Sequence, residues 1–105
     1  MTVADISTLK TSNVKTIIRA ILKKQGNLIN VNCGLSITTG STPTTLFIGI
    51  PTNFRPSVTA ELIGIFTNTN TVARCYITTA GDLVVSVSSA TTETAINISG
   101  TYLLG

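Results

Sequence analysis

The stretch "CYITTAGDLVVSVSS", residues 75–89, carries the clearest structural signal in the chain. Two β-prone, largely alternating runs flank the segment "AGD", and Gly and Asp are favoured in tight turns. The pattern therefore predicts a β-hairpin with its turn at residues 80–82. The stretch contains one acidic residue and no histidine, which indicates scaffold rather than reactive chemistry.

Similar strand patterns lie on both sides of this hairpin. They are separated by turns rich in Gly, Pro or Asn, and the "TNTNT" turn at 67–71 suits a hairpin because Asn tolerates positive φ. Six or so strands spaced about a dozen residues apart predict an all-β fold, a small antiparallel β-barrel or jelly-roll-like sandwich. The further strands are expected in "NLINVNCGLSI" (27–37), "TLFIGI" (45–50), "SVTAELIGIF" (57–66) and "TAINISGTYLL" (94–104).

The N-terminal stretch "TSNVKTIIRAILKKQGN" has a different pattern. Its apolar residues recur at helical spacing, Ser12 or Asn13 is a suitable N-cap, and Gly26 is a suitable C-terminal stop. We expect one short amphipathic helix within an N-terminal neck or docking segment, residues 1–26, ahead of a β head domain, residues 27–105. The helix would pack on the body with Lys15, Arg19 and Lys23 in solvent; a membrane- or nucleic-acid-binding helix and a neck helix in an oligomer are the alternatives.

Composition and charge narrow the class of protein. Only 10% of the 105 residues are charged, against roughly 25% in an average protein. Residues 1–26 hold five Lys or Arg and one Asp, whereas the rest hold two Arg and three acidic residues. The body is too close to neutral to favour nucleic-acid binding. No 18-residue apolar run predicts a membrane helix, and no signal-peptide core is visible, so synthesis in the cytoplasm is expected.

The residues of most enzymes and metal sites are missing. The chain has no histidine, and its acidic residues Asp5, Glu61, Asp82 and Glu93 are dispersed. We therefore expect no catalytic residues, no metal, no cofactor and no enzymatic activity. Cys33 and Cys75 form either a disulfide or two small buried thiols on strands, and the second interpretation is favoured.

Strands such as "TLFIGI" and "LIGIF" are apolar on both faces. In a sandwich with one solvated face, the strands alternate more cleanly than this. A second copy of the chain is the simplest cover for the extra apolar face in a domain this small. The pattern therefore predicts a homo-oligomer.

Residues 46–103 carry an ordered set of motifs: "LFIGIPTNFRPS", then "TAELIGIFTNTNT", "ARCYITTAGDLVVSVSS" and "AINISGTYLL". This order resembles the C-terminal head domains of bacteriophage receptor-binding proteins and of tail-fibre or baseplate proteins. Those domains show similar "P-x-x-[FY]-R-P", "R-x-Y-I-x-x-x-G-x-[ILV]" and "I-x-x-S-G-x-[YF]" segments. The matching residues are Pro51, Phe54, Arg55 and Pro56; Arg74, Tyr76, Ile77, Gly81 and Leu83; and Ile96, Ser99, Gly100 and Tyr102.

The resemblance implies a trimeric head in the virion, at the tip of a fibre or baseplate arm, that attaches the phage to a host cell-surface saccharide. Residues 1–26 would then join other virion proteins. Within the motifs, Arg55 is expected to pair with a backbone carbonyl or a carboxylate at a bend. The alternative is a structural virion protein, such as a capsid decoration or fibre-assembly module, without receptor binding.

The candidate ligand-binding residues lie on two loops and one strand. Loops carry binding more often than strands do, and Asn68, Asn70 and Asp82 are expected on loops at one end of the barrel. Arg74 and Tyr76 are two residues apart and so share one face of their strand. These five residues are the predicted site.

Overall fold

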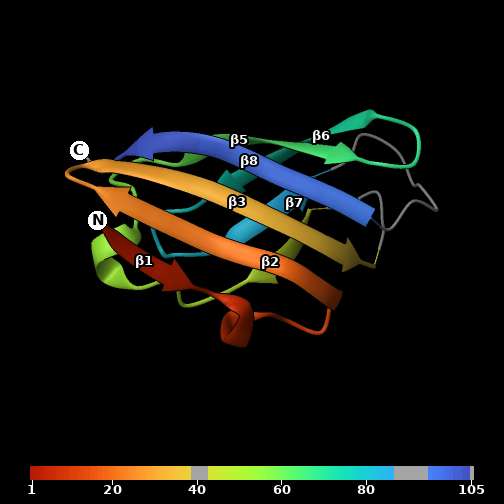
Figure 1. Cartoon of the computed structure of the whole chain (residues 1–105), viewed down its shortest axis with the longest axis horizontal. Helices are drawn as coiled ribbons and strands as arrows, with labels where there is room; N and C mark the ends of the chain where they lie inside the picture. The colour runs from red at the N-terminus through yellow and green to blue at the C-terminus, as the bar shows by residue number, and fades with distance from the viewer. Residues whose placement is uncertain (39–42, 87–94, 105) are drawn as a thin grey trace.

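The computed structural model describes residues 1–38, 43–86 and 95–104 (Figure 1). The described residues form eight β-strands and two isolated 3-10 turns. The strands are β1 (Thr2–Asp5), β2 (Val14–Gln25), β3 (Leu28–Ile37), β4 (Thr44–Phe47), β5 (Ala60–Phe66), β6 (Thr71–Ile77), β7 (Leu83–Ser86) and β8 (Ala95–Leu103), and the turns are η1 (Ser7–Leu9) and η2 (Thr52–Phe54).

All eight strands belong to one antiparallel sheet in the order β1-β2-β3-β8-β5-β6-β7-β4. The sheet curls on itself like a half-barrel, as Figure 1 shows. The free edge of β4 is partly covered by the segment between β1 and β2, because Lys10 bridges Phe47 and the Ile48 amide donates to the Leu9 carbonyl at 3.1 Å. The expectation of an all-β, antiparallel, barrel-like fold is confirmed.

The concave side of the sheet holds the hydrophobic core. Along β3 and β5 each buried residue alternates with an exposed one over most of the strand, as the two-residue period of a strand requires. The largest fully buried side chains come from every part of the sheet and include Phe47, Phe66, Leu22, Ile29, Leu35, Ile77, Leu83 and Ile96. The described residues bury no polar or charged side chain in this core.

The predicted N-terminal helix is wrong: residues 14–25 form the strand β2, which pairs with both β1 and β3. The mistake has a physical origin. Residues four apart share a face in a helix and also in a strand, so the spacing of Lys15, Arg19 and Lys23 does not distinguish the two. Two irregularities in the β2–β3 register shift the alternation and produce helix-like spacing. The run of Ile and Thr, whose branched side chains favour strands, was the better indicator.

Gly26 does not end a helix but helps to turn the chain from β2 into β3. It has φ +62° and precedes Asn27, and the flanking Gln25 and Leu28 pair across the hairpin. Glycine is favoured at the first central position of such a two-residue turn because that position needs positive φ. β1 and β2 are consequently strands of the same sheet as the rest of the chain.

The other hairpin predictions are confirmed within the described residues. β6 and β7 pair on either side of a turn at 78–82, and β5 and β6 pair on either side of the Asn-rich turn, where Asn70 has φ +61°. Residues 87–89, at the end of the quoted stretch, and Glu93 lie outside the described part of the chain.

The resemblance motifs meet as structural contacts. The Tyr102 hydroxyl on β8 donates a buried hydrogen bond to the Phe54 carbonyl at 2.6 Å, and Arg55 Nε donates to the Ile50 carbonyl at 2.6 Å. Gly81 leaves room for this arginine, since a Cβ there would lie 2.6 Å from Arg55 Nε. The expectation that Arg55 pairs with a backbone carbonyl is confirmed.

Candidate functional site

The convex face of β2, β3 and β8 presents a grid of polar side chains. The strand register aligns Lys23 with Asn30 and Asn30 with Thr101; a neighbouring row aligns Asn32 with Ser99. Residues directly opposite each other in antiparallel strands lie on the same face, close enough to interact. We call this surface the polar face and define it by Arg19, Ile21, Lys23, Asn30, Asn32, Asn97, Ser99 and Thr101.

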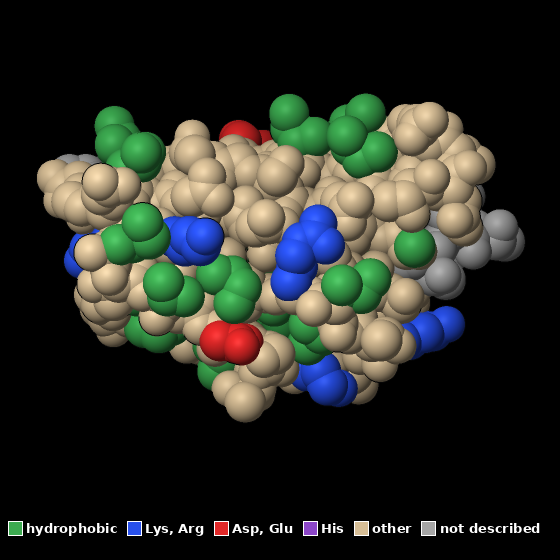
Figure 2. Space-filling view, in the orientation of Figure 1, with side chains coloured by type: hydrophobic (Ala, Val, Ile, Leu, Met, Phe, Trp, Pro, Cys, Tyr) green, Lys and Arg blue, Asp and Glu red, His purple; other side chains and the backbone are tan. Residues whose placement is uncertain are grey.

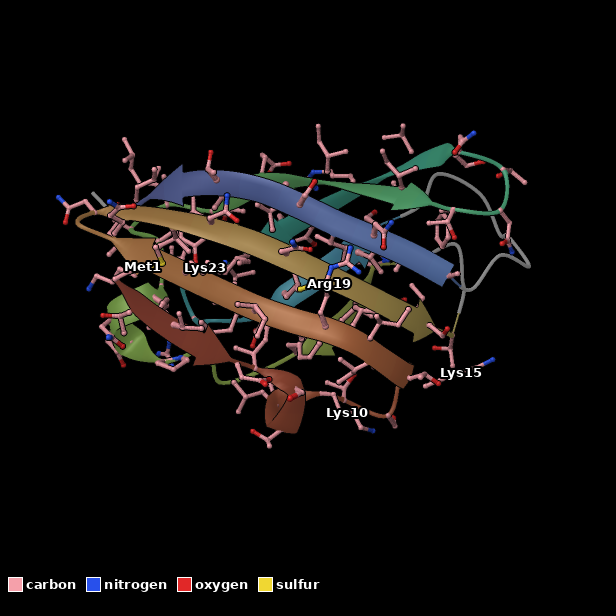
Figure 3. The ribbon with its side chains drawn as sticks, viewed as in Figure 1. Met1, Lys10, Lys15, Arg19 and Lys23 are labelled. Atoms are coloured by element: carbon pink, nitrogen blue, oxygen red, sulfur yellow. The ribbon has the colours of Figure 1, made fainter. Side chains whose placement is uncertain are left out.

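Arg19 lies across the middle of the polar face (Figure 3). Its Nε donates to Asn32 Oδ1 at 2.6 Å, and its Nη2 lies 3.4 Å from Asn97 Oδ1. The two asparagines stand on different strands, β3 and β8, so the guanidinium spans three strands from its origin on β2. A register irregularity just before Arg19 aims its side chain outward over β3.

Gly34 provides the space for this arrangement. It pairs with Arg19 on one side and Asn97 on the other. A Cβ at this position would lie 2.5 Å from Arg19 Nη1 and 3.0 Å from Arg19 Cζ. The guanidinium therefore rests directly on the backbone of β3, where any larger residue would displace it.

A shallow hollow of about 110 Å³ opens beside this guanidinium, lined by Arg19, Ile21, Lys23, Asn30 and Asn32. Pockets for drug-sized molecules are typically about 300 Å³ or larger. The hollow therefore has room for one functional group of a ligand and the atoms next to it. Its polar lining comes from two cations and two amides, and Ile21 supplies an apolar patch between them.

The charge of Arg19 is matched by amide oxygens and not by a carboxylate. Within residues 1–38, 43–86 and 95–104, the ion pair between Arg74 and Glu61 is the single salt bridge. Asparagine oxygens orient a guanidinium by accepting its hydrogen bonds, but they do not neutralise it. The polar face consequently keeps an oriented positive charge in its centre.

Of the predicted site residues, Arg74 and Tyr76 are brought together on the convex face of β6. Arg74 Nε and Nη2 donate to the two Glu61 carboxylate oxygens at 2.7 and 2.8 Å. The Arg74 guanidinium also lies 4.3 Å from the centre of the Tyr76 ring. These hydrogen bonds lower the pKa of Glu61 and raise that of Arg74. Arg74 is thus already paired, which leaves it less available to a ligand than Arg19.

The remaining predicted residues do not join this pair. Asn68 and Asn70 lie in the exposed turn that precedes β6, whereas Asp82 lies in the turn that follows it. The two turns stand at opposite ends of a seven-residue strand, about 20 Å apart at the usual rise per residue. The structure therefore places Asn68 and Asn70 at one end of the sheet and Asp82 at the other, instead of all three at one end.

Sequence reasoning missed Arg19, Asn30, Asn32 and Asn97 as a group. A signal existed in β3, where Asn30 and Asn32 alternate with apolar residues and so mark an exposed face. Assigning β2 as a helix removed Arg19 from that face. Long-range pairing of β3 with β8, which brings in Asn97, could not be deduced from local patterns.

The convex face of β5 and β6 is aliphatic over the first part of β6. Ile65 pairs with Val72, and Ile63 follows on the same face with 57% of its surface exposed. We call Ile63, Ile65 and Val72 the apolar face. Figure 2 shows hydrophobic side chains along the upper edge of the view, where Figure 1 places β8, β5 and β6, and further hydrophobic side chains among the basic ones in the middle of the face. The expectation that "LIGIF" is apolar on both sides is confirmed.

Both thiols are free and buried on strands, β3 for Cys33 and β6 for Cys75, as the favoured interpretation predicted. Burial raises the pKa of each thiol to about 12, so neither is a nucleophile near neutral pH. The part of the chain that the structure describes contains no group of three or more His, Cys, Asp or Glu residues placed to hold a metal ion.

Comparison with protein-family models and with curated protein sequences finds no match. Among the described residues, no helix is long and apolar enough to cross a membrane.

Proposed function

We propose that this protein is a non-enzymatic adhesion module of a bacteriophage particle, a head domain that attaches the virion to a saccharide on the host cell surface. The observation that carries the proposal is the oriented Arg19 guanidinium, held between Asn32 and Asn97 on the exposed polar face. The ordered motifs of residues 46–103 support the assignment to a phage head domain.

The chemistry of the polar face suits a sugar. Sugar hydroxyls both donate and accept hydrogen bonds, and asparagine amides do the same in a fixed plane. Asn30, Asn32 and Asn97 present such amides on neighbouring strands, with Ser99 and Thr101 beside them. The rigid sheet holds these groups in place before binding, which limits the entropy lost when a ligand is ordered.

Assembly into a trimer is part of the proposal. The apolar face of Ile63, Ile65 and Val72 would pack against another copy of the chain, because water otherwise covers three neighbouring aliphatic side chains. Ile65 and Ile63 pair with Asn97 and Ser99 of β8, so the apolar face borders the polar face on that strand. The part of the polar face on β2 and β3, with Arg19 and Lys23, would remain outside the contact and available to the host. Several copies of one weak sugar site on a particle would bind a cell surface far more tightly than one copy.

A binding assay on whole cells tests the function. Fluorescently labelled protein should bind saturably to cells of a susceptible bacterium, and purified surface polysaccharide from those cells should compete. An array of bacterial glycans then identifies the saccharide. Absence of binding to every strain and glycan, with the protein folded and oligomeric, would contradict an adhesion role.

The second candidate is a structural virion protein without receptor binding. The apolar face favours it, since packing between virion subunits also requires exposed aliphatic residues. In either case residues 1–26 would join other virion proteins, and the outer edge of β1, which pairs only with β2, offers unpaired backbone groups for such a contact. A structural protein would co-assemble with particle components while leaving host cells unlabelled.

A further inference from the structure

The hollow beside Arg19 is placed to add specificity to the proposed saccharide-binding function, on which its role rests. We propose that this hollow selects saccharides that carry an acidic group, a carboxylate or a phosphate, and that Arg19 and Lys23 bind that group. The preference would separate the ligand of this protein from neutral sugars of the same shape.

Arg19 has hydrogen-bonding capacity that its contacts within the chain do not use. Two of its donors are directed to Asn32 and Asn97 through Nε and Nη2. Among the described residues nothing accepts a hydrogen bond from Nη1. The anchored Nε and Nη2 fix the plane of the guanidinium, and Nη1 lies over Gly34. Nη1 and the second hydrogen of Nη2 form a planar fork that fits two oxygens of one acidic group.

The charge around the hollow is positive. Lys23 lines it together with Arg19, four residues away on the same face of β2 (Figure 3). No carboxylate of the described residues lines the hollow or pairs with either cation. A neutral ligand would leave both charges without a counter-charge, whereas an acidic group would satisfy them.

The size of the hollow and the absence of a side chain at Gly34 both suit an acidic group. About 110 Å³ admits one acidic group with the adjoining sugar atoms, while the rest of the saccharide would extend over Asn30 and the hydroxyls of β8. Gly34 keeps Arg19 flat against the sheet. Gly34 is thus a positioning residue, because it acts on the ligand only through the arginine.

The experiment compares matched acidic and neutral sugars. A glycan array would carry uronic-acid, sialic-acid and phosphorylated bacterial oligosaccharides, each beside its carboxyl-reduced or dephosphorylated form. The unmodified protein should bind an acidic member at least about tenfold more tightly than its neutral counterpart, as expected for charge-assisted hydrogen bonds. Comparison of the carboxylate-bearing sugars with the phosphorylated sugars shows which acidic group the protein binds.

Variants connect this preference to the hollow. Arg19→Ala should weaken binding of the acidic sugar about tenfold to a hundredfold. Arg19→Lys should restore only part of it because the fork is lost. Gly34→Ala, which keeps the charge and moves the guanidinium, should weaken binding several-fold. Lys15→Ala removes a charge from the same strand outside the hollow and should change binding less than about twofold. Unchanged thermal unfolding shows that each variant is folded.

The outcomes are distinct. A preference for the acidic sugar that disappears in Arg19→Ala and survives in Lys15→Ala supports the proposal. Equal binding of acidic and neutral partners, or a preference that Arg19→Ala leaves intact, overturns it while saccharide binding itself stands. Failure to bind any sugar or host cell overturns the proposed function, and the inference with it.

Discussion

The two convex surfaces of this sheet differ in character although the same strands build both the surfaces and the core. The polar face on β2, β3 and β8 carries Asn, Ser, Thr and basic residues around Ile21, and the apolar face on β5 and the start of β6 carries Ile and Val. Ile18, Leu28 and Leu103 are also exposed on the first group of strands, outside the polar face. The concave side shows no such division, since buried aliphatic residues come from both groups of strands. Under the proposed function, the difference reflects what each surface would meet outside the chain.

Unfolding at alkaline pH should show that the two regions share one core. The expected change in the free energy of unfolding is the largest of the predicted effects. Cys33 lies under the polar face and Cys75 under the apolar face, and burial raises the pKa of both thiols from near 9 to about 12. Between those values the unfolded chain loses protons that the folded chain keeps, so stability is complete below pH 9 and falls as pH rises toward 12. The slope is on the order of 1 kcal/mol per pH unit for each thiol.

Denaturant titrations at several pH values measure this slope. Removing either thiol, in Cys33→Ala or Cys75→Ala, should reduce this slope by the contribution of about one proton. Tyr102, whose pKa burial raises from 10 to about 12, adds to the slope above pH 10, and Tyr102→Phe serves to subtract it. A slope that responds to one thiol and not the other would show that the regions do not unfold together.

Association should depend on the apolar face alone. Ile65→Asp would bring a carboxylate into the proposed contact between copies and should weaken it by about 2 kcal/mol or more. Sedimentation of the unmodified chain should give a trimer and that of the variant smaller species. Ile18→Asp is the matched control, because Ile18 is also exposed but lies on β2. Equal dissociation by both variants would remove the distinction between the two faces.

Two glycines offer a smaller and more local comparison. A Cβ on Gly64 of β5 would lie 2.6 Å from Cys75 Sγ and 3.0 Å from Ile96 Cδ1, inside the core. Gly64→Ala should therefore lower the free energy of unfolding by about 1–3 kcal/mol. Gly34→Ala meets the movable end of Arg19 and should change stability much less. Urea unfolding of both variants measures the two losses of stability. A larger loss in Gly34→Ala than in Gly64→Ala would contradict the assignment of the packed side of the sheet.

Much of the fold could be predicted from local patterns, whereas the site could not. The hairpin turns were predictable because Gly, Asn and Asp mark positions with unusual backbone angles, as at Gly81 and Asn70. β2 was mistaken because spacing by four residues fits a helix and a strand equally. The polar face escaped prediction because it depends on pairing between residues far apart in the sequence, such as Asn32 and Ser99.

Arg74 is a second case in which strand pairing decides the role of a residue and the local sequence does not show it. Its position on an exposed strand beside Tyr76 made it a reasonable candidate for ligand binding. Only the register of β5 against β6 reveals that Glu61 lies directly opposite Tyr76 and close enough to take up the guanidinium. It is easier to predict from a sequence which side chains are exposed than to predict which of them already form an ion pair or hydrogen bond within the chain.

The most direct test of the division between the two faces is an NMR titration of the ¹⁵N-labelled protein with an acidic oligosaccharide that binds on the array. The account predicts shifts at Arg19, including its Nε resonance, at Asn32 and Asn97 side-chain amides, and none at Val72. Shifts centred on β5 and β6, with the Arg19 Nε resonance unmoved, would contradict it.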